Sequence, residues 1–190
     1  MPSGVPELRA ELALAQHDLA SAARKLDIFE RSSVASDKQA LSEAAAMRGD
    51  LALYTGNHAE ADGLYRESAQ IDPHVSVALR MANLHRVTGA FDNAIATLAS
   101  ASRAEKHTPV VLSGIALQTG MIASARGDYV AANNWNDRAE TLFPGHWLTA
   151  LYRAEGRLAN GQTQSAITEL ERVARDHARP EAMDMLALVW

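Results

Sequence analysis

Histidines are the first candidates for chemistry in this chain, because two histidines four residues apart on one helix can hold a metal ion. The chain has seven histidines, and no two of them combine that spacing with a third ligand nearby. They are His17, His58, His74, His85, His107, His146 and His177. We therefore expect no metal site.

Nucleophilic and phosphate-binding motifs are also missing from the sequence. The absence of cysteine removes thiol nucleophiles, thiolate metal sites and disulfides together. There is no Gly-Lys-Ser/Thr phosphate loop and no Gly-x-Ser-x-Gly elbow. The carboxylates Glu169 and Glu171 would lie on different faces of a helix, where arginines nearby can pair with them. We therefore predict that the chain is not an enzyme and uses no cofactor.

The charge balance argues against a nucleic-acid or membrane-surface partner. The 190-residue chain has 18 Lys and Arg against 23 Asp and Glu, a formal net charge of −5, and only three of its cations are lysine. A protein that binds phosphates generally needs a basic excess instead. No run approaches the ~18 apolar residues of a membrane-spanning helix, so no membrane insertion is expected.

The first residues bear on the compartment. MPSGVPELRAEL has no basic flank followed by an apolar core, so no signal peptide is predicted. The absence of cysteine is compatible with both the cytoplasm and the periplasm. We expect a cytoplasmic protein, and the periplasm stays open as the alternative.

The elements that would position functional side chains are helices. Hydrophobic residues make up 47% of the chain, and no stretch alternates apolar and polar residues as a strand would. Four glycines lie 33, 38 and 34 residues apart, each with a small residue seven positions before it and an alanine five positions after it. These triplets are Gly49, Gly56 and Ala61; Ala82, Gly89 and Ala94; Gly120, Gly127 and Ala132; and Ala154, Gly161 and Ala166. A period near 34 predicts stacked helix–turn–helix repeats whose paired helices touch at the buried alanines.

These residues resemble the tetratricopeptide repeat (TPR) family. GNHAEADGLYRESAQIDP (56–73) and GDYVAANNWNDRAETLFP (127–144) are similar to the second helix of that repeat, from its turn glycine to its closing proline. The segments that begin at Gly89 and Gly161 follow the same pattern with weaker ends. The large aromatic residue early in the family's first helix is replaced by alanine in all four units. The resemblance implies an all-α fold, a right-handed α-solenoid of helix–turn–helix repeats.

The predicted organisation has two parts. Residues 1–35 form an N-terminal helix and linker, and residues 36–190 form the TPR-like solenoid. Its repeats are expected at about 42–75, 75–108, 113–146 and 147–180, followed by a partial helix over 181–190.

The segment before the repeats predicts one long helix. Between residues 5 and 30, apolar residues recur at alternating steps of three and four, which places a narrow seam on one helix of about 25 residues. The seam consists of Val5, Leu8, Leu12, Ala15, Leu19, Ala22, Leu26 and Phe29. We expect this helix to pack on the first repeat as a cap, and the alternative is that its seam pairs with another chain or with the concave groove.

The last residues begin a further helix that is apolar on two stripes. Met183, Leu186, Ala187 and Trp190 form one stripe, and Ala182, Met185 and Val189 form the other. The terminal helix of a solenoid needs a polar outer face. Either the solenoid continues past residue 190, or this surface contacts a partner, with self-association through residues 183–190 or the N-terminal helix as one form of that contact.

In the TPR family the first helices of the repeats line the concave side, and the resemblance carries their inward positions over to this chain. Those positions are Asp50, Tyr54, Leu79, Asn83, Arg86, Leu117, Met121, Leu148, Leu151, Tyr152 and Glu155. Family members that hold C-terminal carboxylates use lysine, arginine and asparagine there, and Asn83 matches that set. Leu117, Leu148 and Tyr152 stand where cations are needed, which argues against such a carboxylate clamp.

The predicted lining is therefore apolar with a few polar groups. We predict a non-catalytic protein–protein interaction scaffold whose concave groove binds an apolar or amphipathic segment of a protein partner. One alternative is a secretion or assembly chaperone of TPR type that shields apolar segments of a client. The other is a regulatory TPR domain of a larger enzyme.

Overall fold

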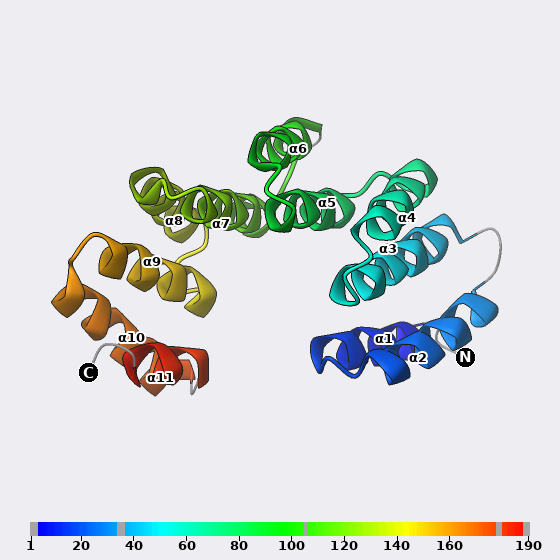
Figure 1. Ribbon diagram of the computed structural model, residues 1–190, viewed down its shortest axis with the longest axis horizontal. Helices are drawn as coiled ribbons and strands as arrows, with labels where there is room; N and C mark the ends of the chain where they lie inside the picture. Colours follow the sequence, from blue (N-terminus) through cyan, green and yellow to red (C-terminus); the bar gives the residue numbers. More distant parts are fainter. Residues whose placement is uncertain (1–3, 34–36, 105, 178–179, 188–190) are drawn as a thin grey trace. The chain divides into compact units, whose positions relative to one another are not determined.

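The computed structural model describes residues 4–33, 37–104, 106–177 and 180–187, and every regular element within these ranges is an α-helix (Figure 1). This confirms the all-α prediction. The helices are α1 (Gly4–Ala15), α2 (Leu19–Ser32), α3 (Lys38–Tyr54), α4 (His58–Ile71), α5 (Val75–Val87), α6 (Phe91–Ala104), α7 (Pro109–Ala125), α8 (Tyr129–Leu142), α9 (Trp147–Ala159), α10 (Thr163–His177) and α11 (Pro180–Ala187).

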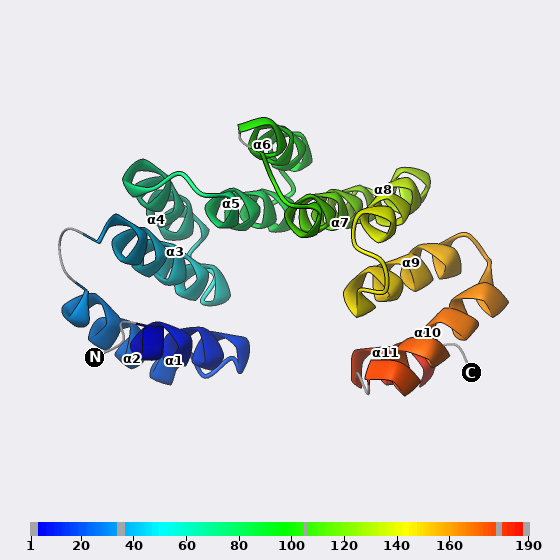
Figure 2. The same ribbon diagram turned by 180° about the vertical axis from the view of Figure 1, so that it is seen from behind.

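The chain forms two compact units, Met1–Thr97 and Leu98–Trp190, and the boundary between them falls within α6. In the first unit α1 packs on α2 and α3 packs on α4, and in the second unit α7 packs on α8 and α9 packs on α10. The same pairs lie side by side when the molecule is seen from behind (Figure 2). Each unit is therefore a run of helix–turn–helix repeats.

The turn inside each repeat is closed by two backbone hydrogen bonds. In the turn between α3 and α4, the N–H of Gly56 donates to the carbonyl of Leu53 (3.0 Å) and the N–H of Asn57 donates to that of Ala52 (2.8 Å). Gly56 has a φ of +83°, a left-handed conformation that glycine adopts without steric cost. The same conformation occurs at Gly89, Gly127 and Gly161.

The prediction of one long helix over residues 5–30 is wrong, because the chain turns at His17. His17 has a φ of +54°. Its N–H donates to the carbonyl of Leu14, and the N–H of Asp18 donates to that of Ala13, both at 3.0 Å. These are the two bonds of the other turns, so α1 and α2 form a further repeat in which histidine takes the place of the turn glycine.

A signal for this repeat was present in the sequence. Ala10 stands seven residues before His17 and Ala22 stands five residues after it, the spacing seen around each turn glycine, and both alanines are buried. The turn residue conceals the pattern, because it is a histidine where the other four repeats have glycine.

The turn also divides the predicted seam between solvent and core. Leu8 and Leu12 of α1 are 64% and 54% exposed, whereas Leu26 and Phe29 of α2 are almost fully buried. In α1 the buried face is the one that carries Ala10, Ala13 and Leu14. A second helix folding back at His17 selects which face of α1 is covered, and that face differs from the seam.

The closest approach of two paired helices combines a small residue on the first helix with a larger one on the second. A Cβ atom added to Gly49 would overlap the fully buried ring of Tyr65, which lies nine residues after the turn glycine. A Cβ on Gly120 would overlap Oδ1 of Asn136, at the same two positions of another repeat. Ala94 and Ala132, predicted to be buried at such contacts, are fully buried. Close contact therefore sets the residue size at each position.

The final described helix packs on the second unit. Ala182 of α11 is buried, and Met185 and Leu186 pack against the cluster of apolar residues that α9 and α10 share. Met183 is 61% exposed. Val189 and Trp190, predicted to extend the two apolar stripes, lie outside the described residues. Within the described ranges, no helix has the length and apolar character needed to cross a bilayer.

Candidate functional site

Asp50, the first of the predicted groove residues, belongs to an ion-pair network that joins α3, α4 and α5. Its Oδ2 accepts a hydrogen bond from Nε of Arg80 (2.9 Å), and its Oδ1 accepts one from the hydroxyl of Tyr65 (2.7 Å). Nη2 of Arg80 also lies 2.5 Å from Oε1 of Glu43. One guanidinium from α5 thus holds two carboxylates of α3, and the network stabilises the packing of three successive helices.

Burial and charge compete in this network. Burial raises the pKa of Asp50, and the opposing effects of Arg80 and Tyr65 do not cancel that shift. Burial lowers the pKa of Arg80, but Asp50 and Glu43 outweigh it, so that the pKa is raised above its ordinary value. Burial also raises the pKa of Tyr65, which keeps its hydroxyl protonated as a donor. The network is therefore a closed cluster in which Arg80 carries the positive charge.

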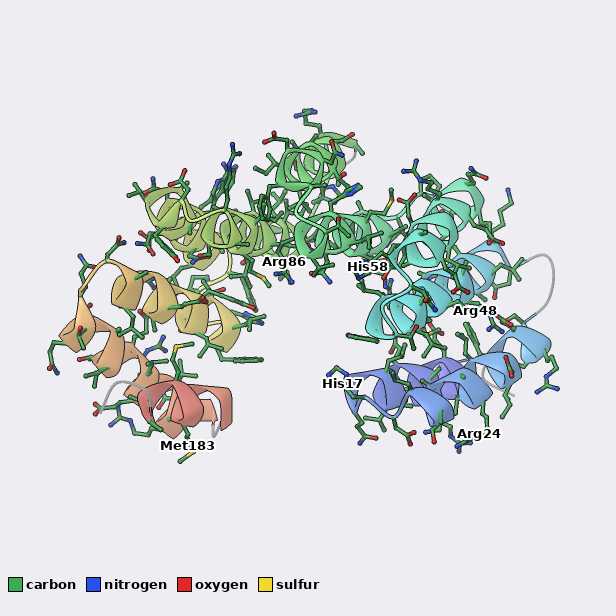
Figure 3. The ribbon with its side chains drawn as sticks, viewed as in Figure 1. His17, Arg24, Arg48, His58, Arg86 and Met183 are labelled. Carbon is green, nitrogen blue, oxygen red and sulfur yellow. The ribbon has the colours of Figure 1, made fainter. Side chains whose placement is uncertain are left out.

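The other predicted residues of the first unit lie on α3 and α5. Tyr54 is 50% exposed, and its ring contacts that of His17 edge-on, with centroids 5.1 Å apart. Figure 3 shows His17 at the end of the α1–α2 hairpin. Nε and Nη2 of Arg86 donate to Oδ1 of Asn83 at 3.2 and 2.8 Å, which fixes both side chains on α5. Leu79 is half-buried.

A pocket of about 300 Å³ in the first unit was missed by sequence reasoning. It is lined by Glu7, Glu11, Gln39, Ser42, Glu43, Asp72, His74, Ser76 and Arg80. Four carboxylates face one guanidinium there, and burial together with neighbouring carboxylates raises the pKa of Glu7. The signal that could have found it is the position of Glu11, which precedes His17 by six residues as Asp50 precedes Gly56.

In the second unit the predicted residues divide between core and surface. Leu117 of α7 and Leu151 of α9 are 6% and 8% exposed, so they belong to the helix packing. Leu148 and Tyr152 of α9 are half-buried and pack against the cluster that contains Leu117. Met121 of α7 is also half-buried. Leu148 and Tyr152 therefore lie beside a buried cluster that contains Leu117, while Leu117 itself belongs to the core.

Two arginines of α9 are held by carboxylates on the helices that flank it. Nη1 of Arg157 contacts Oε2 of Glu169 on α10. Nη1 of Arg153 lies 3.3 Å from Oε1 of the same Glu169, and its Nε lies 3.0 Å from Oδ1 of Asp137 on α8. The contact with Asp137 has the distance of an ion pair but lacks the alignment of a hydrogen bond. These arginines therefore have partners on α8 and α10.

Glu155 differs from these charged residues because its side chain makes no hydrogen bond or ion pair with any residue that the structure describes. It is half-buried, and burial raises the pKa of its carboxyl group. Across the described ranges, no group of three or more His, Asp or Glu residues could hold a metal ion.

Comparison with known proteins supports the fold directly. No protein-family model and no curated protein matches the sequence. A TPR repeat-containing protein from Cytophaga hutchinsonii superimposes with a TM-score of 0.56 at 16% identity, over 91% of this chain and 66% of that one. The chain has the TPR fold. PilW, a widely conserved type IV pilus biogenesis factor, gives 0.68 at 16% identity over 91% and 76% of the two chains. Yeast Tom70 gives 0.71 at 16% identity over 98% of this chain and 39% of that protein.

The TPR arrangement relates the candidate residues by position. Within the first unit α1 contacts α3 and α3 contacts α5, and within the second α7 contacts α9, so the first helices of neighbouring repeats adjoin one another. We call the surface that these helices form in each unit its first-helix face. Six residues before the four glycine turns, this face carries Asp50, Asn83, Met121 and Glu155. One repeat position thus holds an ion-paired acid, an amide, a thioether and an acid that has no ion-pair partner among the described residues.

Proposed function

We propose that this TPR chain is a non-catalytic protein-interaction scaffold that binds an apolar or amphipathic segment of a partner on the first-helix face of its second unit. The supporting observation is the half-buried apolar surface where Leu148 and Tyr152 of α9 adjoin Leu117 of α7. Contiguous exposed apolar patches on a protein surface often mark binding sites. An amphipathic helix laid across two helices would cover this surface with its apolar face.

Two residues suit this surface for recognition. Tyr152 presents a large rigid ring with a polar tip, the kind of side chain that dominates interface energies. Met121 is flexible and polarisable, so it adapts to side chains of different shape. Arg153 and Arg157 of α9, in contrast, are already paired with Asp137 and Glu169. They favour a structural role over catalysis.

The test is partner capture by variants that keep the core intact. Leu117 is unsuitable because it is buried, so the double variant Tyr152→Ala with Met121→Ala replaces two half-buried side chains instead. The matched control is Val130→Ala, which removes a 68% exposed apolar side chain from α8. We expect proteins captured by the wild type and by the control to be lost with the double variant, at unchanged helical content. Capture that survives the double change would contradict the proposal.

A second candidate is an assembly chaperone, favoured by the shared fold with PilW, a type IV pilus biogenesis factor. A chaperone would use the same surface, but it would keep an aggregation-prone client in solution. Light scattering of a purified captured partner, with and without the chain, separates the two functions. Suppression of aggregation at stoichiometric amounts would support the chaperone, and a stable complex with a folded partner would support the scaffold.

A further inference from the structure

The carboxylate of Glu155, which has no partner among the described residues, indicates the charge that a partner should carry. Glu155 lies three residues after Tyr152 and seven after Leu148 on α9, and this spacing places the three side chains on one face of the helix. The apolar surface proposed for partner binding thus has one acidic group at its edge. Its chemistry can be read from the equivalent position in the first unit.

Asp50 occupies that equivalent position in the first unit, and its charge is balanced by a cation. The cation that pairs with Asp50 is Arg80, which comes from the next first helix along the chain, α5. The next first helix after α9 is α11, whose sequence Pro180–Ala187 contains no lysine or arginine. The nearby Arg153 and Arg157 of α9 already contact Asp137 and Glu169. Within the described residues, no cation therefore forms an ion pair with Glu155.

A half-buried carboxylate without a partner is unfavourable, because burial removes water that stabilises its charge. A cation supplied from outside would restore that stabilisation, and it would do so most effectively when the apolar flank of the partner excludes water from the pair. A phosphate-bearing ligand would instead be repelled by Glu155. Charge complementarity therefore selects a cationic segment with apolar neighbours.

We propose that Glu155 binds a lysine or arginine side chain of the partner, so that the segment recognised by the second unit is an amphipathic helix with a cation beside its apolar stripe. This rests on the proposed function, because it assumes that the segment covers Leu148 and Tyr152. The partner's cation takes the place that Arg80 holds beside Asp50 in the first unit.

The experiment uses two synthetic amphipathic peptides that differ in the charge of one side chain. One carries a single arginine beside a leucine stripe on an otherwise uncharged helix, and the other carries citrulline, its neutral near-isostere, at the same place. Their affinities for the full chain are measured by fluorescence anisotropy. We expect the arginine peptide to bind the wild type about tenfold more tightly, as a partly desolvated charge pair would. In Glu155→Gln the two peptides should bind equally.

A matched control is Glu171→Gln, which removes an exposed carboxylate from α10 and should leave the arginine preference unchanged. Equal binding of both peptides to the wild type would overturn this inference alone, because an apolar surface would still be binding them. An arginine preference that persists in Glu155→Gln would also overturn it, since another acid would be responsible. If neither peptide binds, or if Tyr152→Ala leaves binding of the citrulline peptide unchanged, the proposed function fails as well.

Discussion

The two units place an acidic residue at the same repeat position and surround it differently. In the first unit, Arg80 and Tyr65 satisfy Asp50 from the two helices packed beside it. In the second unit, Glu155 has no such partner among the described residues, and its neighbours on the same face of α9 are Tyr152 and Leu148. The difference shows that an acid at one position of the repeat is ion-paired, or left without a cation of the described chain, according to what the next first helix supplies.

The largest loss of stability should come from removing the cation of the ion-pair network around Asp50. Arg80→Met leaves Asp50 and Glu43 partly buried without their cation, and we expect the free energy of unfolding to fall by about 3 kcal/mol at pH 7. The loss should shrink as the pH falls through the carboxylate range, because protonated carboxyl groups need no cation. Urea denaturation across pH measures both effects.

The control for this change is Arg66→Met. Arg66 pairs with Asp62 one turn away on the exposed side of α4. Exposed pairs of this kind contribute little to stability, because water screens the two charges. If the two arginine variants lose the same stability, the network around Asp50 is no stronger than a surface pair, and the contrast between the units fails.

The second effect concerns the contact that positions Tyr65 beside Asp50. Gly49→Ala places a methyl group against the buried ring of Tyr65, and we expect a loss of about 1–3 kcal/mol from overpacking. The control is Gly63→Ala on α4, where nothing lies near the new methyl group and helix propensity should add about 0.5–1 kcal/mol of stability. Thermal unfolding that moves both variants in the same direction would contradict this packing.

A third, smaller effect on stability concerns the turns at His17 and Gly161. His17→Gly should raise the free energy of unfolding by about 0.5 kcal/mol, because glycine adopts the positive φ without strain, less what the contact with Tyr54 contributes. Gly161→His, the reverse change in the second unit, should lower it by about 1 kcal/mol. Chemical denaturation of both variants tests whether the two turns are equivalent, and equal signs would argue against it.

The smallest effect on stability should come from replacing Glu155, the acid of the second unit. Glu155→Gln should raise the free energy of unfolding at pH 7 by about 0.3–0.5 kcal/mol, a modest gain because water still screens the exposed half of the side chain. The folded-state pKa of Glu155 is raised, so protonation stabilises the fold and ionisation opposes it. The advantage of glutamine should therefore vanish as the pH falls below the unfolded pKa of glutamate. Glu171→Gln, on the exposed face of α10, is the control variant.

The repeats could be predicted from the sequence because their requirements are local. A turn closed by two backbone hydrogen bonds needs a left-handed residue, and paired helices in contact need small residues at fixed distances from it. Gly56, Ala94 and Ala132 satisfy these requirements in any surroundings, and the structure shows the turn and the buried alanines where the spacing places them.

Other features depended on which helix packs on which face, and that information is not local. The turn at His17 exists because α2 folds back on α1, although histidine has no intrinsic preference for a positive φ as strong as that of glycine. Leu117 and Leu151 share the spacing of groove residues, yet neighbouring helices bury them. Asp50 and Glu155 are indistinguishable by spacing. Only the tertiary structure places Arg80, 30 residues along the chain, beside Asp50. It places no cation of the described chain beside Glu155, because side-chain partners are determined by contact in space.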